Sequence, residues 1–310
     1  MERFLKIIIS GLDEAGKTSI LTALDKKYDF HKDIMELKPT IRVEYHKMNF
    51  LTNHVNFWDM GGQEIYREIY QKNQDVYFDG TDLLIYVIDI QDSDRFENSL
   101  EYLNLILQFF KESHMDVPII VTFHKYDPDL RNDEILLNNI EKLKEKLLEK
   151  YSSFKILFQQ SSIYDIISII QLVSYGLSVF DEKFFELSEL LEAYIEEFSS
   201  EALIVFDRNG IIIGEYYSED IEPELYISLL ESIKEHLFLL KRMQEESIET
   251  DHDFSSIEDK LLSYLHRIKI SDESFYVSVV IKKNKKDSLI DKFPEFLETL
   301  EEILKVLIPK

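Results

Sequence analysis

The chain contains no cysteine. This absence excludes disulfides, thiolate metal ligands, a thiol nucleophile, and prenyl or palmitoyl anchors. The sequence also lacks a run of 18 apolar residues and a signal-peptide pattern, and its second residue is Glu2 where myristoylation requires glycine. We therefore expect a cytoplasmic protein that is recruited to a membrane only through a partner.

Positive charge is scarce relative to negative charge, with 35 Lys and Arg against 60 Asp and Glu and a net charge of −25. The imbalance is greater in residues 181–310, with 15 against 31, than in residues 1–180, with 20 against 29. Such a surface repels nucleic acid and anionic lipid, so we exclude both as direct partners. The excess of acidic residues fits two interpretations. It either keeps the protein soluble or forms an acidic face for a basic partner.

The clearest motif lies at residues 6–19, which read KIIISGLDEAGKTS. A β-branched run ends at Gly11, and Gly16-Lys17-Thr18 opens the next helix. Glycines at these positions let backbone N–H groups converge on an anion at the positive end of that helix. Lys17 then supplies a charge to the terminal phosphates and Thr18 a hydroxyl to Mg²⁺. The alternative is a chance match in an ordinary strand-to-helix turn, but the context favours a nucleotide-binding P-loop.

Two further segments supply groups for the same phosphates. Thr40 precedes a strand and offers its hydroxyl to Mg²⁺ and its N–H to a γ-phosphate. The strand of VNFWDMGGQE delivers Asp59 to the metal side of the site. Gly61 and Gly62 let the backbone approach a terminal phosphate, and Gln63 is placed to position an attacking water. In isolation, each segment is most often an ordinary turn, but Asp59, Gly61, Gly62 and Gln63 in this order after the P-loop lysine favour the functional interpretation.

A third region offers contacts to a base. The strand within VTFHKYDPDL ends at His124, Lys125 and Asp127. A carboxylate at the position of Asp127 accepts both N–H donors on the Watson–Crick edge of guanine, and the stem of Lys125 lies along the base. After the next strand, a backbone N–H near Ser162 and Ile163 faces the guanine carbonyl oxygen. A solvated loop is the alternative interpretation of these residues.

The first half of the chain alternates strand-like and helix-like segments, which predicts an α/β fold with a mostly parallel six-stranded sheet. The polar stretch Asp29–Lys38 is predicted to be a loop. The segment LLIYVIDIQDSDRF is predicted to be a buried parallel strand and an acidic loop, and we assign it no chemistry. The predicted strands are Phe4–Ile9, Ile41–Asn49, Val55–Asp59, Leu83–Asp89, Ile119–His124 and Lys155–Gln160, and the predicted helices are Lys17–Lys27, Ile65–Asn73, Arg95–Glu112, Asp133–Lys150 and Asp165–Phe180.

The pattern changes after Phe180. The order becomes helix, two strands, helix, three strands, helix, which predicts one antiparallel sheet with helices packed across it, an α+β domain. Asn209-Gly210 between two apolar runs is a strong hairpin signal. We therefore divide the chain into a P-loop domain, 1–180, and a second domain, 183–310, in which no residue pattern indicates catalysis.

These five segments, in this order and spacing, resemble the guanine-nucleotide motifs of the small GTPase superfamily. TIRVEYHKMNFLTNHVNFWDMGGQE, LLIYVIDIQD and SSIYD resemble the Rag/Gtr type, closest to its Rag A-like branch. HKYD carries His124 where most GTPases have asparagine, a substitution that this branch shares. In element order, 183–310 is similar to the roadblock or longin-like domain of Rag/Gtr proteins.

The resemblance implies binding of GTP or GDP with Mg²⁺. It assigns Thr18, Thr40 and Asp59 to the metal and Gln63 to the attacking water. The nucleotide-binding residues that it implies are Asp13, Glu14, Ala15, Gly16, Lys17, Thr18, Ser19, Thr40, Gly62, His124, Lys125, Asp127, Ser162 and Ile163.

The sequence departs from the family pattern in three respects. Asp13 and Glu14 repel phosphate, and His124 lacks the two hydrogen bonds of an asparagine amide. No arginine precedes Thr40, and Arg42 follows it. We therefore expect slow intrinsic hydrolysis that depends on an activating partner.

The resemblance also implies partners. We expect a GTP/GDP-dependent switch that forms a homodimer or heterodimer with another Rag-like GTPase through 183–310, together with a roadblock-type scaffold. The alternatives are a weakly hydrolysing nucleotide-bound scaffold that assembles roadblock-type partners, and an Arf-like trafficking GTPase.

Overall fold

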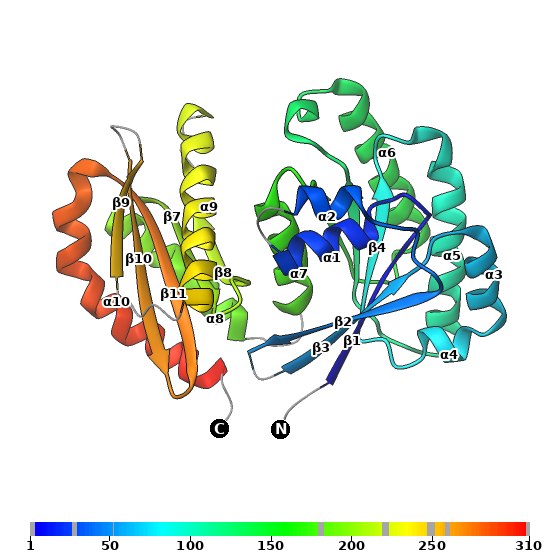
Figure 1. Cartoon of the computed structure of the whole chain (residues 1–310), viewed down its shortest axis with the longest axis horizontal. Helices are drawn as coiled ribbons and strands as arrows, with labels where there is room; N and C mark the ends of the chain where they lie inside the picture. The colour runs from blue at the N-terminus through cyan, green and yellow to red at the C-terminus, as the bar shows by residue number, and fades with distance from the viewer. Residues whose placement is uncertain are drawn as a thin grey trace. The chain divides into compact units, whose positions relative to one another are not determined.

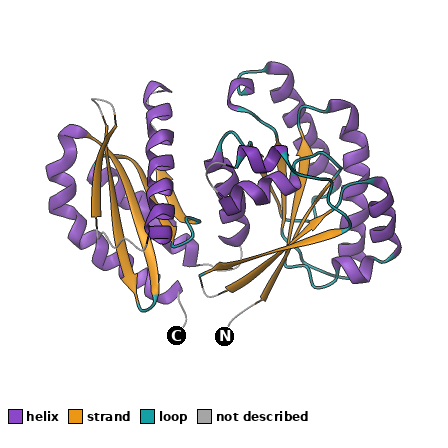
Figure 2. Ribbon diagram, in the orientation of Figure 1, coloured by secondary structure: helices purple, strands orange, loops and turns teal. Residues whose placement is uncertain are grey.

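The computed structural model of the chain divides into two compact units, which are described separately (Figures 1 and 2). The first comprises Glu2–Asn49 and Asn53–Leu172, and the second comprises Val173–Lys310 with Met1 and Phe50–Thr52. The boundary that we predicted, between residues 180 and 183, lies outside the described residues. The structure describes residues 4–26, 30–51, 53–178, 183–218, 223–246, 252–257 and 261–307.

The first unit contains a six-stranded sheet in the order β2-β3-β1-β4-β5-β6, with helices on both faces (Figure 1). Strand β1 pairs in parallel with β3 and β4, β4 with β5, and β5 with β6, so the predicted α/β fold is confirmed. The strands are β1 Phe4–Gly11, β2 Val43–Phe50, β3 Asn53–Met60, β4 Leu83–Asp89, β5 Ile119–His124 and β6 Ile156–Ser161. The α-helices are α1 Lys17–Lys26, α2 His31–Met35, α3 Glu64–Lys72, α4 Gln74–Phe78, α5 Phe96–Glu112, α6 Glu134–Lys150 and α7 Ile166–Ser178, of which residues 166–172 belong to this unit.

The registers of the parallel strands bring the polar residues of the motifs to one edge of this sheet. Ile9 pairs with Asp59, Asp89 with His124, and His124 with Ser161. The strands before these residues are apolar and buried, as expected in a sheet covered on both faces. Loops that follow the carboxyl ends of such strands form the usual ligand site of an open α/β sheet.

Two short helices were not predicted. Residues Asp29–Lys38 were assigned to a loop, but they contain α2. Phe30 is buried and its carbonyl accepts a hydrogen bond from Ile34 N at 2.9 Å, so one apolar anchor orders a polar segment. Helix α4 likewise buries Phe78.

The second unit contains an antiparallel sheet in the order β8-β7-β11-β10-β9, which confirms the predicted α+β pattern. Helices α8 and α10 pack against each other on one face of this sheet, and Figure 1 shows α9 on the other face. The elements are α8 Lys183–Phe198, β7 Ser200–Asp207, β8 Ile212–Tyr217, α9 Pro223–Glu246, β9 His252–Ile257, β10 Leu261–Ile270, β11 Glu273–Lys282 and α10 Lys286–Leu307.

The predicted Asn-Gly hairpin joins β7 to β8. Gly210 adopts a φ of 70°, a left-handed conformation that glycine tolerates best. The carboxylate of Asp207 accepts hydrogen bonds from Asn209 N and Ile211 N, both at 2.8 Å. An aspartate that bonds to the backbone of its own turn therefore fixes this turn.

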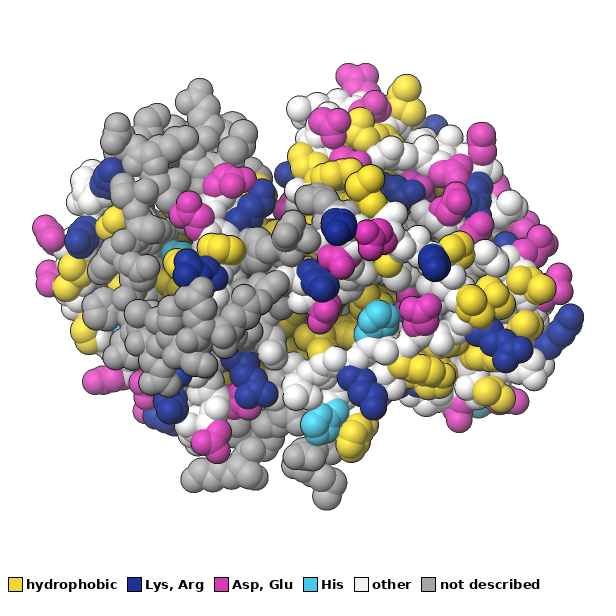
Figure 3. Space-filling view, in the orientation of Figure 1, with side chains coloured by type: hydrophobic (Ala, Val, Ile, Leu, Met, Phe, Trp, Pro, Cys, Tyr) yellow, Lys and Arg dark blue, Asp and Glu magenta, His cyan; other side chains and the backbone are white. Residues whose placement is uncertain are grey.

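No helix in the described ranges combines the length and the apolar character needed to cross a bilayer. On the described part of the face drawn in Figure 3, Asp and Glu side chains are scattered among Lys and Arg rather than gathered in one patch. On that face, the distribution favours a solubilising role for the acidic side chains.

Candidate nucleotide-binding site

The loop between β1 and α1 has the backbone geometry of an anion cradle. Gly11 has a φ of 146°, and a Cβ there would overlap the carbonyl oxygen of Val87. Gly16 has a φ of 95°, and its carbonyl accepts the first helical bond of α1 from Ile20 N at 2.9 Å. Both positions therefore require glycine, and the loop closes on the N-terminus of α1.

Lys17 carries a buried positive charge into this cradle. Its side chain is 5% exposed, and Nζ donates to the carbonyl oxygens of Gly11 at 3.1 Å and Leu12 at 2.5 Å. Burial lowers the pKa of Lys17 to about 8, although the charges of Asp59 and Asp13 oppose the shift. A cation held by neutral carbonyls in a buried site is well suited to bind terminal phosphates.

Thr18, Thr40 and Asp59 bring oxygen atoms together beside Lys17. Asp59 Oδ2 accepts from Thr18 Oγ1 at 2.6 Å and from Thr40 Oγ1 at 3.3 Å, and the two hydroxyl oxygens lie 2.9 Å apart. Asp59 is fully buried, and within the described residues its Oδ1 has no hydrogen-bond partner. Mg²⁺ prefers oxygen ligands, so the two threonine hydroxyls and Asp59 Oδ2 fit the metal that the sequence predicts.

The glycines after Asp59 bring the backbone onto the P-loop. A Cβ on Gly62 would overlap the backbone of Leu12 and Asp13, so this position requires glycine for close approach. Gly61 N donates to the carbonyl of Arg42 at 2.6 Å, and Arg67 Nε donates to the carbonyl of Gly62 at 2.9 Å. These contacts hold the segment before β2 and the segment before α3 together beside the P-loop.

Gln63 occupies the N-terminal cap of α3 in an extended conformation, with a φ of −61° and a ψ of 145°. Its side chain is half-buried, and among the described residues it makes no hydrogen bond. Gln63 therefore stands beside Gly62 with an amide that remains available to a water molecule.

His124 is fixed between a strand and the P-loop. Its Nδ1 lies 2.9 Å from Ser161 Oγ, and a Cβ on Gly16 would lie 2.7 Å from His124 Nε2. Burial lowers the pKa of His124 to about 3, with a smaller contribution from the Lys125 charge, so the ring is neutral at physiological pH. The imidazole therefore packs on the P-loop as a neutral group.

The predicted base-contacting residues lie together beyond His124. Asp127 accepts from Ser162 Oγ at 2.5 Å through Oδ1 and from Gln91 Nε2 at 3.1 Å through Oδ2. Lys125 Nζ pairs with Asp89 Oδ2 at 2.6 Å. These contacts orient the carboxylate of Asp127 at the carboxyl edge of the sheet.

Ser162 and Ile163 lie in the turn after β6. The backbone N–H of Ser162 donates to Ser168 Oγ at 3.0 Å. Of these two residues, Ile163 is therefore the one whose backbone N–H is available to a base. Of the P-loop residues assigned to the nucleotide, Glu14 is exposed with a φ of 61°, Ala15 is buried, and Ser19 lies in the first turn of α1.

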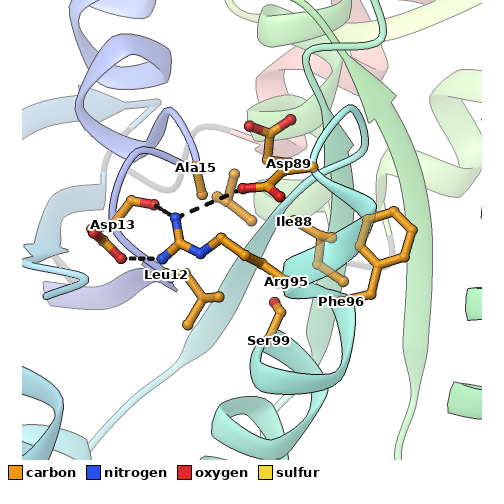
Figure 4. A pocket seen from close by; sticks show the side chains of 10 residues that line it. Leu12, Asp13, Ala15, Ile88, Asp89, Arg95, Phe96 and Ser99 are labelled. Atoms are coloured by element: carbon orange, nitrogen blue, oxygen red, sulfur yellow. Dashed lines mark hydrogen bonds and ion pairs between the residues drawn. The ribbon is translucent and has the colours of Figure 1, made fainter. Parts of the chain in front are cut away.

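Three residues that the sequence analysis left without a role belong to this region. Asp89 is the last residue of β4 and pairs with Lys125, and Gln91 follows this strand and donates to Asp127. Arg95 forms an ion pair with the carboxylate of Asp13 and donates from Nη1 to the Asp13 carbonyl at 3.1 Å (Figure 4). Their position after the central parallel strand is the sequence signal that could have identified them.

The Arg95 ion pair compensates the negative charge that Asp13 brings to the P-loop. We expect Arg95→Ala to weaken binding of GTP by about tenfold, and of GDP by less, because the carboxylate would then repel the nucleotide. The double variant Asp13→Ala/Arg95→Ala should regain most of that affinity. Titration calorimetry with both nucleotides measures the effect.

A matched control is Arg208→Ala, which removes a similarly exposed arginine paired with Glu273 at 3.6 Å in the second unit. Its nucleotide affinity should equal that of the unmodified protein. Equal losses in Arg95→Ala and the double variant would show that Arg95 acts independently of Asp13.

Comparison with known proteins identifies the family. The model of the ADP-ribosylation factor family matches residues 1–169. Ras-related GTP-binding protein A of Dictyostelium discoideum is 30% identical over 205 residues, 62% of this chain and 66% of that protein. ADP-ribosylation factor-like protein 3 of Chlamydomonas reinhardtii is 39% identical over 122 residues, 39% of this chain and 63% of that protein.

The match therefore spans slightly less than two thirds of the length of these two relatives. GTP-binding protein gtr1 of Schizosaccharomyces pombe is 26% identical over 282 residues, 89% of this chain and 88% of that protein. The Arl6 BBS3 small GTPase of Trypanosoma brucei, solved with a nucleotide analogue, shares 18% identity at a TM-score of 0.47 over 57% of this chain and 96% of that chain. The chain belongs to the ADP-ribosylation factor family, and its similarity to the relatives named Ras-related GTP-binding protein A and gtr1 fits a small GTPase of the Rag/Gtr type.

Proposed function

We propose that this chain binds GTP and GDP with Mg²⁺ and acts as a nucleotide-dependent switch with slow intrinsic hydrolysis. The observation that carries the proposal is the cluster of Thr18, Thr40 and Asp59 beside the buried Lys17. This cluster brings together side chains from three segments that are far apart in the sequence, which supports a shared site for a metal ion beside the phosphates. When bound, Mg²⁺ would neutralise charge on the phosphates, and these three residues would hold it.

The residues of this chain have distinct roles in the proposed reaction. Lys17 holds the terminal phosphates, and Gly62 brings the backbone to the P-loop. Gln63 orients the attacking water toward the γ-phosphate. Asp127 selects guanine, since its two oxygens match the two N–H donors of that base.

The proposed switch lies in the contacts that hold Gly61 and Gly62. Gly61 N donates to the carbonyl of Arg42, which follows Thr40, and Tyr70 Oη donates to the same carbonyl at 2.5 Å. The segments around Thr40 and Gly62 therefore move together. Hydrolysis of the γ-phosphate would release both at once and change the surface that partners bind.

The proposal of slow hydrolysis is supported by the two arginines that contact Gly62 and the P-loop. The guanidinium of Arg95 is held by Asp13, and Arg67 Nε is held by the carbonyl of Gly62. Because both guanidinium groups already have partners in the chain, we propose that an activating partner supplies the group that stabilises charge in the transition state.

We predict that Gln63→Leu lowers single-turnover release of phosphate from GTP by about tenfold or more, because leucine cannot orient water. Affinity for GDP should be unchanged. Gln71→Leu, on the exposed side of the same helix α3, is the matched control and should hydrolyse GTP at the normal rate. If Gln63→Leu and the unmodified protein release phosphate equally slowly, the alternative of a weakly hydrolysing nucleotide-bound scaffold is favoured.

We also propose that residues 183–310 join two GTPase chains into a homodimer or heterodimer. The described sheet of the second unit ends at β8 and β9, and edge strands offer backbone groups to another chain. Sedimentation of the full chain at micromolar concentration should show a dimer, alone or after addition of a related chain. A monomer under both conditions would contradict this proposal and leave nucleotide binding unaffected.

A further inference from the structure

We propose that Glu44, His46 and Asp59 form a binding site for a divalent transition-metal ion, which shares Asp59 with the magnesium position proposed above but uses the other oxygen of its carboxylate. Each of these residues offers one ligand atom, and the three atoms lie within 4.8 Å of one another. Glu44 and His46 are two residues apart in β2, so their side chains leave the same face of the strand. Asp59 comes from β3, the neighbouring strand.

Two buried atoms without partners point to a ligand at this place. Asp59 is 0% exposed, and its two oxygens differ, since Oδ2 accepts from Thr18 and Thr40 while Oδ1 has no partner among the described residues. His46 Nε2 is also buried without a partner in the described structure. A buried polar atom without a partner is destabilising because folding has removed its hydrogen bonds to water. A cation between Nε2 and Oδ1 would satisfy both atoms.

The ligand set favours a transition metal over Mg²⁺. Mg²⁺ binds oxygen and retains water, whereas an imidazole nitrogen with two carboxylates suits Zn²⁺, Co²⁺ or Mn²⁺. Three protein ligands leave room for a water on the ion. Glu44 is exposed, so the site has a route from solvent.

The second ion would act on the switch through Asp59. Strand β2 follows Thr40, and β3 ends in Asp59 and the glycines that contact the P-loop. An ion bound by residues of both strands would fix the position of Asp59 while its Oδ2 remains bonded to Thr18 and Thr40.

The test uses the full chain without a histidine tag and without nucleotide, in excess Mg²⁺. Co²⁺ is added, and its visible absorption reports a nitrogen-containing, low-coordinate site. We expect one Co²⁺ per chain, displaced by Zn²⁺, with His46→Ala lowering affinity at least about tenfold. Glu44→Gln, a change at an exposed side chain, should also weaken binding without affecting the fold.

The matched control is His54→Ala, which removes the histidine of β3 whose Nδ1 lies 2.8 Å from Asn49 Oδ1. Its Co²⁺ affinity should be unchanged. The proposal would be overturned if both His46→Ala and Glu44→Gln bound Co²⁺ as tightly as the unmodified protein. It would also be overturned if the unmodified protein showed no saturable Co²⁺ absorption. Because nucleotide is absent, failure of this test leaves the proposed GTP switch standing.

Discussion

Replacement of Lys17 by alanine should reduce the affinity for GTP and GDP by about a thousandfold. A hydrogen bond to a charged group contributes about 1.5–3 kcal/mol, and Lys17 is placed to form two with the phosphates. The loss is large because Lys17 is the cation buried within the P-loop, at 5% exposure. Fluorescent-nucleotide titration at fixed Mg²⁺ measures it.

Lys26→Ala is the control for this change, since Lys26 lies in the last turn of the same helix and is exposed. Its nucleotide affinity should remain normal. If Lys17→Ala lowered the nucleotide affinity by less than about tenfold, the phosphates would have to lie elsewhere. The loss of two hydrogen bonds to a charged group should lower the affinity by more than that.

The same residue predicts a pH dependence. Burial lowers the pKa of Lys17 to about 8 in the free protein, and bound phosphates favour its charged form. Above pH 8 the free protein loses this proton, so binding must take one up and affinity should fall as the pH rises. Lys17→Ala should lack this dependence. Calorimetry in buffers of different ionisation enthalpy counts the proton.

Replacement of Gly16 by alanine should destabilise the first unit by about 3 kcal/mol. The φ of 95° disfavours any side chain by about 1–2 kcal/mol. The new Cβ would also lie 2.7 Å from His124 Nε2, and overpacking of this kind costs about 1–3 kcal/mol more. Urea unfolding of the nucleotide-free protein measures the difference.

Gly80→Ala separates these two causes. Gly80 has a φ of 65°, and its added Cβ would meet no atom within 4 Å. Only the backbone cost of about 1–2 kcal/mol is then expected. If the two glycine variants were equally stable, the close approach of His124 to the P-loop would be energetically unimportant.

The order of elements was predictable because it depends on local pattern. The apolar run before Gly11, the helical period after Asp133 and the Asn209-Gly210 turn each determine structure within a few residues. Asp133 illustrates this, since its carboxylate accepts from Ile135 N at 2.8 Å and caps α6. Helix α2 was not predicted because its sequence has little periodicity, and the burial of Phe30, a tertiary contact, orders it.

The sequence by itself determined the P-loop, the two fold classes and the candidate residues from Asp13 to Ile163, because each depends on residue type and spacing within a short segment. Only the tertiary structure placed Arg95 on Asp13, the ring of His124 on Gly16, and Asp59 between two threonines and His46. These contacts join strands and loops far apart in the chain. They depend on strand order, register and backbone angles that no local pattern encodes.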